Sequence, residues 1–413
     1  MFNYFVVFLV NLVILAMSKS YFEQLNQTLK NYQRAIPCLL IDLDKVDQNL
    51  AVLQKDLQVN TSFRIVVKSL PSLELIQYVM QEAGTEKLMV FHQPFLTALA
   101  ESLSANADVL LGKPMPIKTA TYFYKNLPEN NQGFNPYQQI QWLVDTETRI
   151  QEYIDLAKQL GQPLRLNLEI DVGLHRGGFK DIAQFKVGLQ LIEQHKEWVN
   201  LSGLMGYDPH VVKLPSFIRS KEKAARLANQ FYKQCKETLQ QDFPNLWSAD
   251  LTFNGAGSPT LALHKKDSPL NDVSAGSCIV MPTTFDMPTL DKYQAACFIA
   301  SPVLKAFEGT TLPALEKMTS FLNLISSSNQ QSFYIYGGFW KADYCYPIGV
   351  KQNSMFISTN QTMLNAPSSV QLKVEDFVFL RPHQSEFVFL QFGNILPIRN
   401  EEIMTPWSIL KNY

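Results

Sequence analysis

The sequence predicts an α/β protein in which a (β/α)₈ barrel is followed by a C-terminal β domain. Up to about residue 260, short apolar or β-branched runs alternate with stretches that place apolar residues on one helical face. This alternation is typical of a parallel sheet wrapped by helices. After about residue 270, helical stripes become scarce and short β-rich runs separated by Gly, Pro, Asn and Ser take over. The predicted boundaries are 17–270 for the barrel and 271–413 for the β domain.

The predicted strands and helices of the barrel follow one another in strict order. Each strand candidate is a short apolar run, and each helix candidate repeats apolar residues three or four positions apart, as at Val46, Leu50, Leu53 and Leu57. Eight strands at this spacing suit a closed barrel better than an open doubly wound sheet. The strand candidates are 38–42, 63–67, 87–91, 108–111, 140–144, 164–170, 201–205 and 251–253, and the helix candidates are 45–57, 73–83, 94–105, 117–125, 146–160, 181–195 and 220–243.

The predicted C-terminal β domain rests on seven short runs. They are rich in β-branched and aromatic residues and are bounded by turn-forming residues, which is the pattern of strands. In chain order they are 277–281, 296–304, 332–338, 354–358, 370–374, 377–382 and 386–393.

Composition excludes several classes of protein. Hydrophobic residues make up 46% of the 413 residues, and 36 Lys+Arg against 37 Asp+Glu leave a net charge of −1. The chain is therefore too apolar for a disordered protein and lacks the basic excess of a nucleic-acid binder. Five cysteines without a CxxC pair argue against a disulfide framework or a cysteine zinc site. A reducing compartment, the cytoplasm, is the expectation.

The N-terminal segment, residues 1–16, allows three interpretations. Residues 2–16 are nearly all apolar, but they are short for a membrane span and no Lys or Arg precedes them, as it would in a signal peptide. Met17 opens a plausible N-terminus, so an upstream start taken as coding is one interpretation. An export or anchor segment, which would change the location, and a packed helix are the others. No other membrane contact is expected.

Candidate catalytic residues follow the predicted strands, because a (β/α)₈ barrel builds its active site at the carboxyl ends of its strands. Lys68 ends the second strand, where burial disfavours a charged amine and favours the neutral amine that forms a Schiff base. A lysine that only extends to the rim is the alternative. The segment EIDVGLHRGGF, 169–179, ends the sixth strand and supplies His175 and Arg176, whose planar fork suits a phenolate or phosphate oxygen. MGYDPH, 205–210, ends the seventh and supplies Tyr207 and His210.

Two loops of small residues complete the predicted site. NGAGSPT, 254–260, and SAGSC, 274–278, could turn backbone amides toward a phosphate, although each alone is more typical of a plain turn. Together with a strand-end lysine and an arginine at the same end of the barrel, they indicate a pyridoxal 5′-phosphate pocket.

In the order of these motifs, from PCLLIDLD through EIDVGLHRGGF, GLMGYD and NGAGSPT to SAGS, the chain resembles the fold-type III pyridoxal-phosphate enzymes from about Ile36 to its C-terminus. It is most similar to their D-threonine aldolase and D-serine dehydratase group. The resemblance implies an alanine-racemase-like barrel, a β domain and a homodimer. It also implies that Lys68 carries the cofactor, that Arg176 and Tyr207 lie near its ring, and that the phosphate is held by the two loops. The residues expected to bind the cofactor are Lys68, Arg176, Tyr207, Asn254, Gly257, Ser258, Thr260, Gly276 and Ser277.

The chain departs from the metal motif of this group. Metal-dependent members carry Pro-x-His-x-Cys or Pro-x-His-x-Asp near the C-terminus, whereas RPHQSEF here places Gln384 and Glu386 at the ligand positions and shifts His383 by one residue. In an extended strand, residues 384 and 386 would share a face. Their oxygen atoms suit Mg²⁺ or Mn²⁺ better than zinc. The alternative is that no metal binds and Glu386 acts directly as an acid or base.

The function that the resemblance implies is a pyridoxal-phosphate lyase acting on D-β-hydroxy-amino acids. Retro-aldol cleavage to glycine and an aldehyde is favoured over dehydration to a keto acid and ammonia. Lys68, His175 and His210 are the candidate bases near Cα, and Glu386 is a further catalytic candidate. An amino-acid racemase, a non-catalytic pyridoxal-phosphate carrier and a barrel enzyme without this cofactor are the alternatives.

Overall fold

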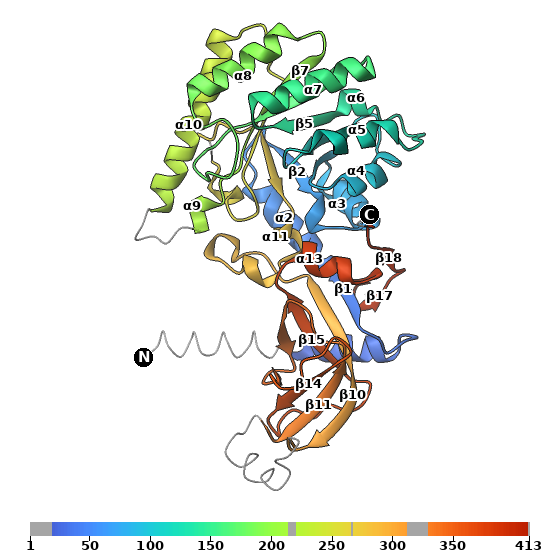
Figure 1. Ribbon diagram of the computed structural model, residues 1–413. Coiled ribbons are helices and arrows are strands. Elements are labelled where there is room, and N and C mark those ends of the chain that lie inside the picture. Colours follow the sequence, from blue (N-terminus) through green and yellow to red (C-terminus); the bar gives the residue numbers. More distant parts are fainter. Residues whose placement is uncertain (1–18, 214–219, 266, 312–328, 412–413) are drawn as a thin grey trace. The chain divides into compact units, whose positions relative to one another are not determined.

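The computed structural model describes residues 19–213, 220–265, 267–311 and 329–411 (Figure 1). The chain divides into two compact units. The barrel unit comprises Asp47–Ile279, Phe285–Tyr293 and Leu410–Tyr413, and the β unit comprises Met1–Val46, Val280–Thr284 and Gln294–Ile409. None of the helices in the described part of the chain is long and apolar enough to cross a membrane. The apolar segment 1–16 lies outside the described residues.

Eight parallel strands form the closed barrel and confirm the predicted fold class. Each strand pairs with the next in sequence, and the last pairs with the first, with Ser62 opposite Asp272. The strands are β2 (Ser62–Val66), β3 (Lys87–Val90), β4 (Asp108–Leu111), β5 (Ile140–Val144), β6 (Leu164–Glu169), β7 (Val199–Gly206), β8 (Thr252–Gly255) and β9 (Asp272–Ala275).

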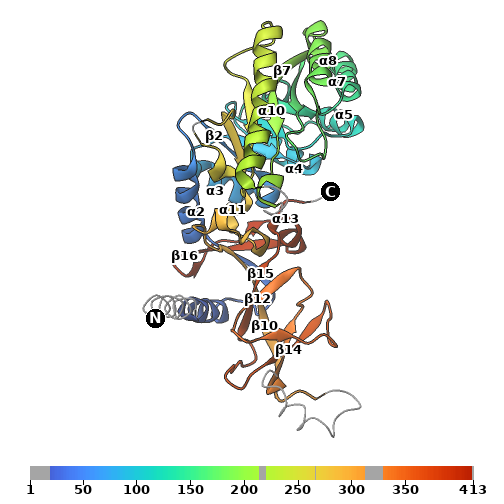
Figure 2. The ribbon, with the colours of Figure 1, turned by 90° about the vertical axis from the view of Figure 1, so that its left-hand side faces the viewer.

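Helices cover the outside of the barrel (Figure 2). Several begin with a side-chain cap that the sequence supplies: Thr146 accepts from the amide of Arg149, and Asp181 accepts from that of Gln184. Gly161 ends α7 in the left-handed conformation. The helices are α2 (Leu43–Asp56), α3 (Leu73–Ala83), α4 (Gln93–Ala100), α5 (Ile117–Lys125), α6 (Pro136–Gln139), α7 (Glu147–Leu160), α8 (Ile182–Gln194), α9 (His210–Lys213), α10 (Lys221–Asp242) and α11 (Ser277–Val280).

The prediction identified the barrel but shifted its strands by one. The first candidate, β1 (Cys38–Asp42), belongs to the β unit, where it pairs with β10 (Cys297–Glu308) and β16 (Asn394–Arg399). The eighth barrel strand is β9, which was not among the strand candidates and whose last two residues, 274–275, were predicted to begin a loop. Both strands are buried on both faces, so their apolar or small residues do not show which sheet they join.

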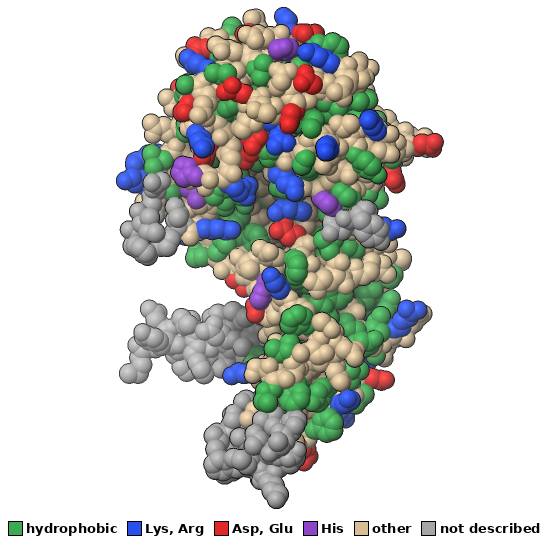
Figure 3. Space-filling model, in the orientation of Figure 1, with side chains coloured by type: hydrophobic (Ala, Val, Ile, Leu, Met, Phe, Trp, Pro, Cys, Tyr) green, Lys and Arg blue, Asp and Glu red, His purple; other side chains and the backbone are tan. Residues whose placement is uncertain are grey.

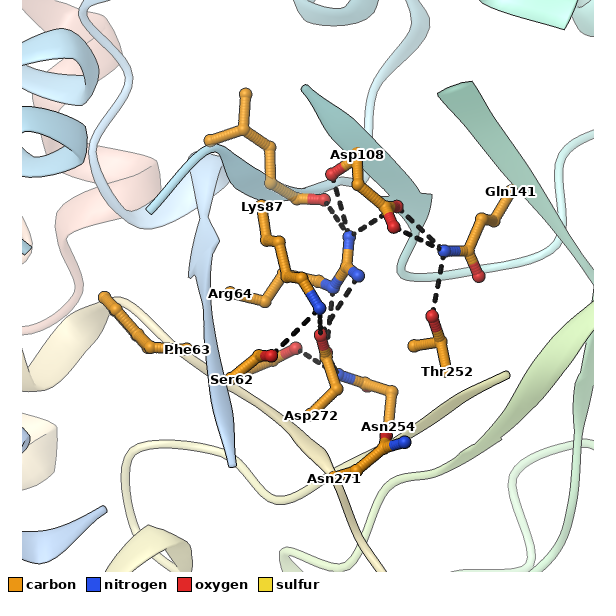
Figure 4. A network of polar contacts seen from close by, with 12 residues as sticks. Ser62, Phe63, Arg64, Lys87, Asp108, Gln141, Thr252, Asn254, Asn271 and Asp272 are labelled. Carbon is orange, nitrogen blue, oxygen red and sulfur yellow. Dashed lines mark hydrogen bonds and ion pairs between the residues drawn. The ribbon is translucent and has the colours of Figure 1, made fainter. Parts of the chain in front are cut away.

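A polar network fills the amino-terminal end of the barrel interior (Figure 4). The guanidinium of Arg64, on β2, is fully buried and donates to Asp272 and Asp108, the first residues of β9 and β4. Lys87, at the start of β3, donates to Asp272 at 3.3 Å. Burial would raise the pKa of Asp108, but Arg64 and Arg165 outweigh it and lower that pKa below its ordinary value. This end of a barrel usually contributes stability rather than catalysis.

The β unit is built on a mixed sheet. Its main path runs β13-β14-β11-β10-β1-β16-β17, and β15 pairs with both β10 and β12. The helical residues 19–30 pack Phe22, Leu25 and Leu29 against its buried face. The strands not yet bounded are β11 (Gln331–Tyr336), β12 (Ala342–Tyr346), β13 (Lys351–Gln352), β14 (Gln361–Ala366), β15 (Phe377–Pro382), β17 (Glu402–Ile403) and β18 (Trp407–Ser408).

Three of the predicted β runs, 296–304, 332–338 and 377–382, coincide with β10, β11 and β15. The others are wrong. Residues 277–281 contain α11. Residues 386–393 overlap α13 (Ser385–Val388) and contain a 3₁₀ turn. Residues 354–358 and 370–374 form no strand. Apolar runs of this length do not distinguish a strand from a buried helical turn.

Candidate active site

Lys68 lies where the sequence predicted, directly after a barrel strand. It is the middle residue of a 3₁₀ turn, Val67–Ser69, that follows β2. Its half-buried amine stands 4.7 Å from the centre of the Phe91 ring, which follows β3. That ring in turn covers Gly112 after β4, because a Cβ atom there would lie 2.2 Å from Phe91 Cζ. The ends of three neighbouring strands therefore supply the Lys68 amine, the Phe91 ring beside it and the Gly112 backbone against which this ring packs.

The two predicted phosphate loops lie together and next to the Lys68 turn. The hydroxyl of Ser258 accepts hydrogen bonds from the amides of Gly276, at 3.3 Å, and Cys278, at 3.1 Å. The hydroxyls of Ser277 and Ser69 are 3.1 Å apart. A Cβ atom at Gly276 would stand 2.8 Å from the carbonyl oxygen of Val66, so only glycine lets the loop approach β2 this closely.

Tyr207 links these loops to Arg176. The Tyr207 ring lies against Gly257, where a Cβ atom would be 2.9 Å from Cε2 of the ring. The Arg176 guanidinium stands over the same ring, 5.1 Å from its centre. The predicted residues Lys68, Ser277, Ser258, Gly276, Gly257, Tyr207 and Arg176 thus form a continuous arc at the carboxyl ends of the strands.

The turn after β6 is organised by Asp171. Its carboxylate accepts from the amides of Gly173, at 3.0 Å, and His175, at 2.9 Å, and it also contacts the imidazole Nδ1 of His175 at 2.9 Å. Despite this pairing, the His175 side chain is 82% exposed. The buried side chain of His210 approaches the same turn, since a Cβ atom at Gly173 would lie 3.0 Å from His210 Nε2.

Two predicted cofactor residues use their side chains elsewhere. The amide of Asn254 lies inside the barrel, where it donates to Asp272 and Ser274. The hydroxyl of Thr260 is fully buried, donates to Asp208 at 2.7 Å and accepts from the amide of Gly257 at 3.2 Å. Neither side chain is directed into the arc by these contacts.

Glu169 is a titratable group of the segment 169–179 that was not predicted to take part in the site. It ends β6 and is 8% exposed. Burial, followed by the neighbouring Asp145, raises its pKa to about 7, and Arg176 opposes the rise. The carboxylates of Glu169 and Asp145 both face Gly177, where a Cβ atom would lie 3.5 Å and 3.9 Å from their oxygens. Its place at a strand end was the signal that could have identified it.

The predicted pairing of Gln384 and Glu386 on one strand face is wrong. The strand β15 ends at Pro382, and Gln384 is the residue before the one-turn helix α13, which contains Glu386. Residues two apart in a helix point to different sides. Gln384 is accordingly exposed and Glu386 is half-buried. Within the described ranges, no group of three or more His, Cys, Asp or Glu residues is arranged to hold a metal ion.

The chemistry of the arc fits pyridoxal phosphate. Lys68 offers an amine for the aldehyde, Arg176 offers cationic donors, and Ser258 and Ser277 offer hydroxyls next to closely approaching backbone. On the face of the barrel unit that Figure 3 shows, acidic and basic side chains are interspersed.

Comparisons with known proteins agree with this fold. The family model described as alanine racemase, N-terminal domain, matches residues 41–283, more than half of the chain. No curated protein sequence matches the chain.

Three similar solved structures are distant in sequence from this chain. A D-threonine aldolase from Filomicrobium marinum has a TM-score of 0.69 at 15% identity and covers 92% of this chain and 98% of its own. A D-threo-3-hydroxyaspartate dehydratase from Delftia sp. HT23 has a TM-score of 0.68 at 15% identity, with coverage of 94% and 100%. An alanine racemase from Bacillus anthracis has a TM-score of 0.67 at 14% identity, with coverage of 91% and 98%. At this identity, the likeness concerns the fold alone.

Proposed function

The chain belongs to the alanine racemase N-terminal domain family of pyridoxal-phosphate enzymes, and from this premise we propose that it is a lyase acting on D-β-hydroxy-amino acids. Retro-aldol cleavage, as in D-threonine aldolase, is the favoured reaction, ahead of dehydration. The observation that carries the proposal is the arc from Lys68 to Arg176, which unites the amine, the phosphate loops and the guanidinium at one end of the barrel.

The residues of the arc divide the binding of the cofactor among them. The amine of Lys68 would take the aldehyde, while Tyr207 and Arg176 would lie along the ring. The backbone and hydroxyl groups of Ser258 and Ser277 would hold the phosphate. When bound, pyridoxal phosphate supplies an electron sink that stabilises negative charge at Cα of the amino acid.

Proton transfer falls to groups near the same strand ends. Lys68, once its amine is released, can accept a proton at Nζ. His175 has Nδ1 against Asp171, which leaves Nε2 as the ring nitrogen that faces outward from that pair. His210 is buried against Gly173 and would act from the interior of the turn. For retro-aldol cleavage, one of these groups must remove the β-hydroxyl proton.

Two further points concern partners and metal ions. A homodimer is expected, as in the family. No metal is part of the proposal, because Gln384 and Glu386, the pair whose oxygen ligands would have suited Mg²⁺ or Mn²⁺ better than Zn²⁺, do not lie on one strand face.

The test is an absorbance spectrum of the purified protein, incubated with pyridoxal phosphate and then freed of unbound cofactor, recorded before and after addition of D-threonine and D-serine. A visible band that disappears in Lys68→Ala but persists in the exposed-lysine control Lys158→Ala would support the cofactor site. Acetaldehyde with glycine from D-threonine would identify the aldolase, and ammonia with pyruvate from D-serine the dehydratase.

Other products separate the rival functions. Formation of the L-enantiomer, without cleavage products, would identify an amino-acid racemase, the alternative favoured by the family match. A band without turnover of any amino acid would indicate a carrier. Absence of a band in the wild type would overturn the proposal.

A further inference from the structure

Asp208 is a buried carboxylate that joins the ends of two barrel strands. It follows β7 directly after Tyr207 and is 4% exposed. Its Oδ1 accepts from the Thr260 hydroxyl at 2.7 Å, and its Oδ2 contacts His264 Nε2 at 2.8 Å. Both partners belong to the segment after β8, so one carboxylate holds this segment at two points.

We propose that Asp208, with Thr260 and His264, forms a clamp that positions the phosphate-binding loop 256–260 against Tyr207. This inference rests on the proposed cofactor site. It gives Thr260 an indirect role, since its hydroxyl serves the clamp instead of the phosphate.

The first arm of the clamp passes through Thr260. Its hydroxyl donates to Asp208 and accepts from the amide of Gly257, so it acts both as a donor and as an acceptor. Gly257 is the residue that the Tyr207 ring covers, and Ser258 beside it binds the amides of Gly276 and Cys278. The position of the Thr260 hydroxyl therefore determines where the whole loop lies.

The second arm passes through His264, whose side chain is 9% exposed. A carboxylate only accepts hydrogen bonds, so Nε2 carries the proton that points to Asp208. The other nitrogen, Nδ1, lies 3.0 Å from the hydroxyl of Ser268, which fixes the orientation of the ring. The His264 side chain thus joins the clamp through Asp208, and its two hydrogen bonds reach no residue of the arc.

A carboxylate this deeply buried is stable only while its hydrogen bonds are made. The clamp therefore has a definite closed arrangement, and loss of either arm leaves a buried polar group without a partner. We expect the consequence to be local, because the barrel strands on either side are held by their own ladder.

The experiment compares the dissociation constants of pyridoxal phosphate and pyridoxal, which lacks the phosphate. Thr260→Val keeps the shape of the side chain but removes the hydroxyl, and Thr260→Ser retains it. We expect Thr260→Val to raise the dissociation constant of pyridoxal phosphate roughly tenfold, the effect of about one buried hydrogen bond. The dissociation constant of pyridoxal should stay within about twofold of the wild-type value. Thr260→Ser should restore binding of the phosphorylated ligand.

The same comparison tests the distant arm. His264→Leu should weaken the binding of pyridoxal phosphate but not that of pyridoxal. His264→Gln, whose amide can still donate to Asp208, should restore most of the affinity for pyridoxal phosphate. Melting temperatures of the ligand-free variants identify any that fail to fold. If Thr260→Val or His264→Leu does not fold, the affinities of Thr260→Ser and His264→Gln test the clamp.

Several results would overturn the clamp. If Thr260→Val weakened the binding of pyridoxal phosphate and of pyridoxal equally, the Thr260 hydroxyl would only stabilise the fold and would not position the phosphate-binding loop. Unchanged affinities in Thr260→Val and His264→Leu would show that the clamp has no role in binding the phosphate. A wild type that binds neither ligand would overturn the proposed function, whereas a wild type that binds pyridoxal phosphate with no change in the variants would overturn only the clamp.

Discussion

The guanidinium of Arg64 makes two parallel hydrogen bonds to the carboxylate of Asp272, from Nε to Oδ1 at 2.9 Å and from Nη2 to Oδ2 at 3.1 Å. Arg64 is completely buried, and Asp272 is 1% exposed. The pair joins β2 to β9 and so closes the ring of strands from inside. Because the two strands are far apart in sequence, this side-chain contact reinforces the junction that completes the barrel.

We predict that Asp272→Asn destabilises the protein by about 3–5 kcal/mol, because it leaves the buried charge of Arg64 without its main counter-charge. Urea denaturation measures the change. The matched control is Asp242→Asn, which breaks the exposed ion pair of Asp242 with Lys186 and should cost less than about 1 kcal/mol. Equal effects of the two substitutions would contradict the structural role of the network.

Glu169→Gln is predicted to stabilise the protein above neutral pH and to have no effect in acid. The carboxyl pKa is about 7 in the folded chain against 4.5 in the unfolded one, so folding favours the protonated form. Wild-type stability therefore falls as pH rises from 4.5 to 7 and stays lowered above it. The amide removes this penalty, which is about 3 kcal/mol for a pKa raised from 4.5 to about 7.

Thermal or urea denaturation at pH 5 and pH 8 measures the difference for Glu169→Gln. The exposed Glu197→Gln provides the control for a charge change at the surface. A gain in stability that is the same at both pH values, or larger at pH 5, would be inconsistent with the raised pKa.

The seating of Phe91 on Gly112 predicts a strongly coupled pair. Gly112→Ala places a methyl group against the tip of the Phe91 ring and should cost about 1–3 kcal/mol by overpacking. In the Phe91→Leu background the ring tip is absent, so the same substitution should cost little. Denaturation of the four proteins of this double-mutant cycle gives the coupling. Additive effects would show that the ring does not rest on the glycine.

The barrel was predictable because its strands alternate with helices and its chemistry follows the strand ends. This rule pointed to Lys68, Arg176 and the two loops as candidates before any resemblance was considered. What the sequence could not show was which sheet a strand joins: Cys38–Asp42 precedes the barrel strands in sequence yet pairs with strands from the far end of the chain. Such long-range pairing leaves no trace in a local pattern.

The site residues that the sequence misplaced depend on side-chain direction. Thr260 lies in the predicted phosphate loop, but its hydroxyl faces Asp208, which no spacing indicates. Glu169 was visible at a strand end, while its raised pKa depends on burial beside Asp145, a residue of another strand end. Gln384 and Glu386 were paired only on the assumption that β15 continued past Pro382.

Removal of divalent metal is predicted to leave the reaction rate unchanged. Gln384 precedes α13 and Glu386 lies within it, so the two residues do not share the strand face on which two ligands of one ion were expected. His383, the nearest imidazole in sequence, pairs instead with Asp343, with 3.0 Å between Nε2 and Oδ1. Product formation from D-threonine or D-serine, assayed after dialysis against EDTA and again after addition of Mg²⁺, Mn²⁺ or Zn²⁺, checks this. Gln384→Ala should also retain full activity. If EDTA abolished turnover, and one metal restored it in the wild type but not in Gln384→Ala, residue 384 would be a ligand and α13 would have to rearrange to bring Glu386 beside it.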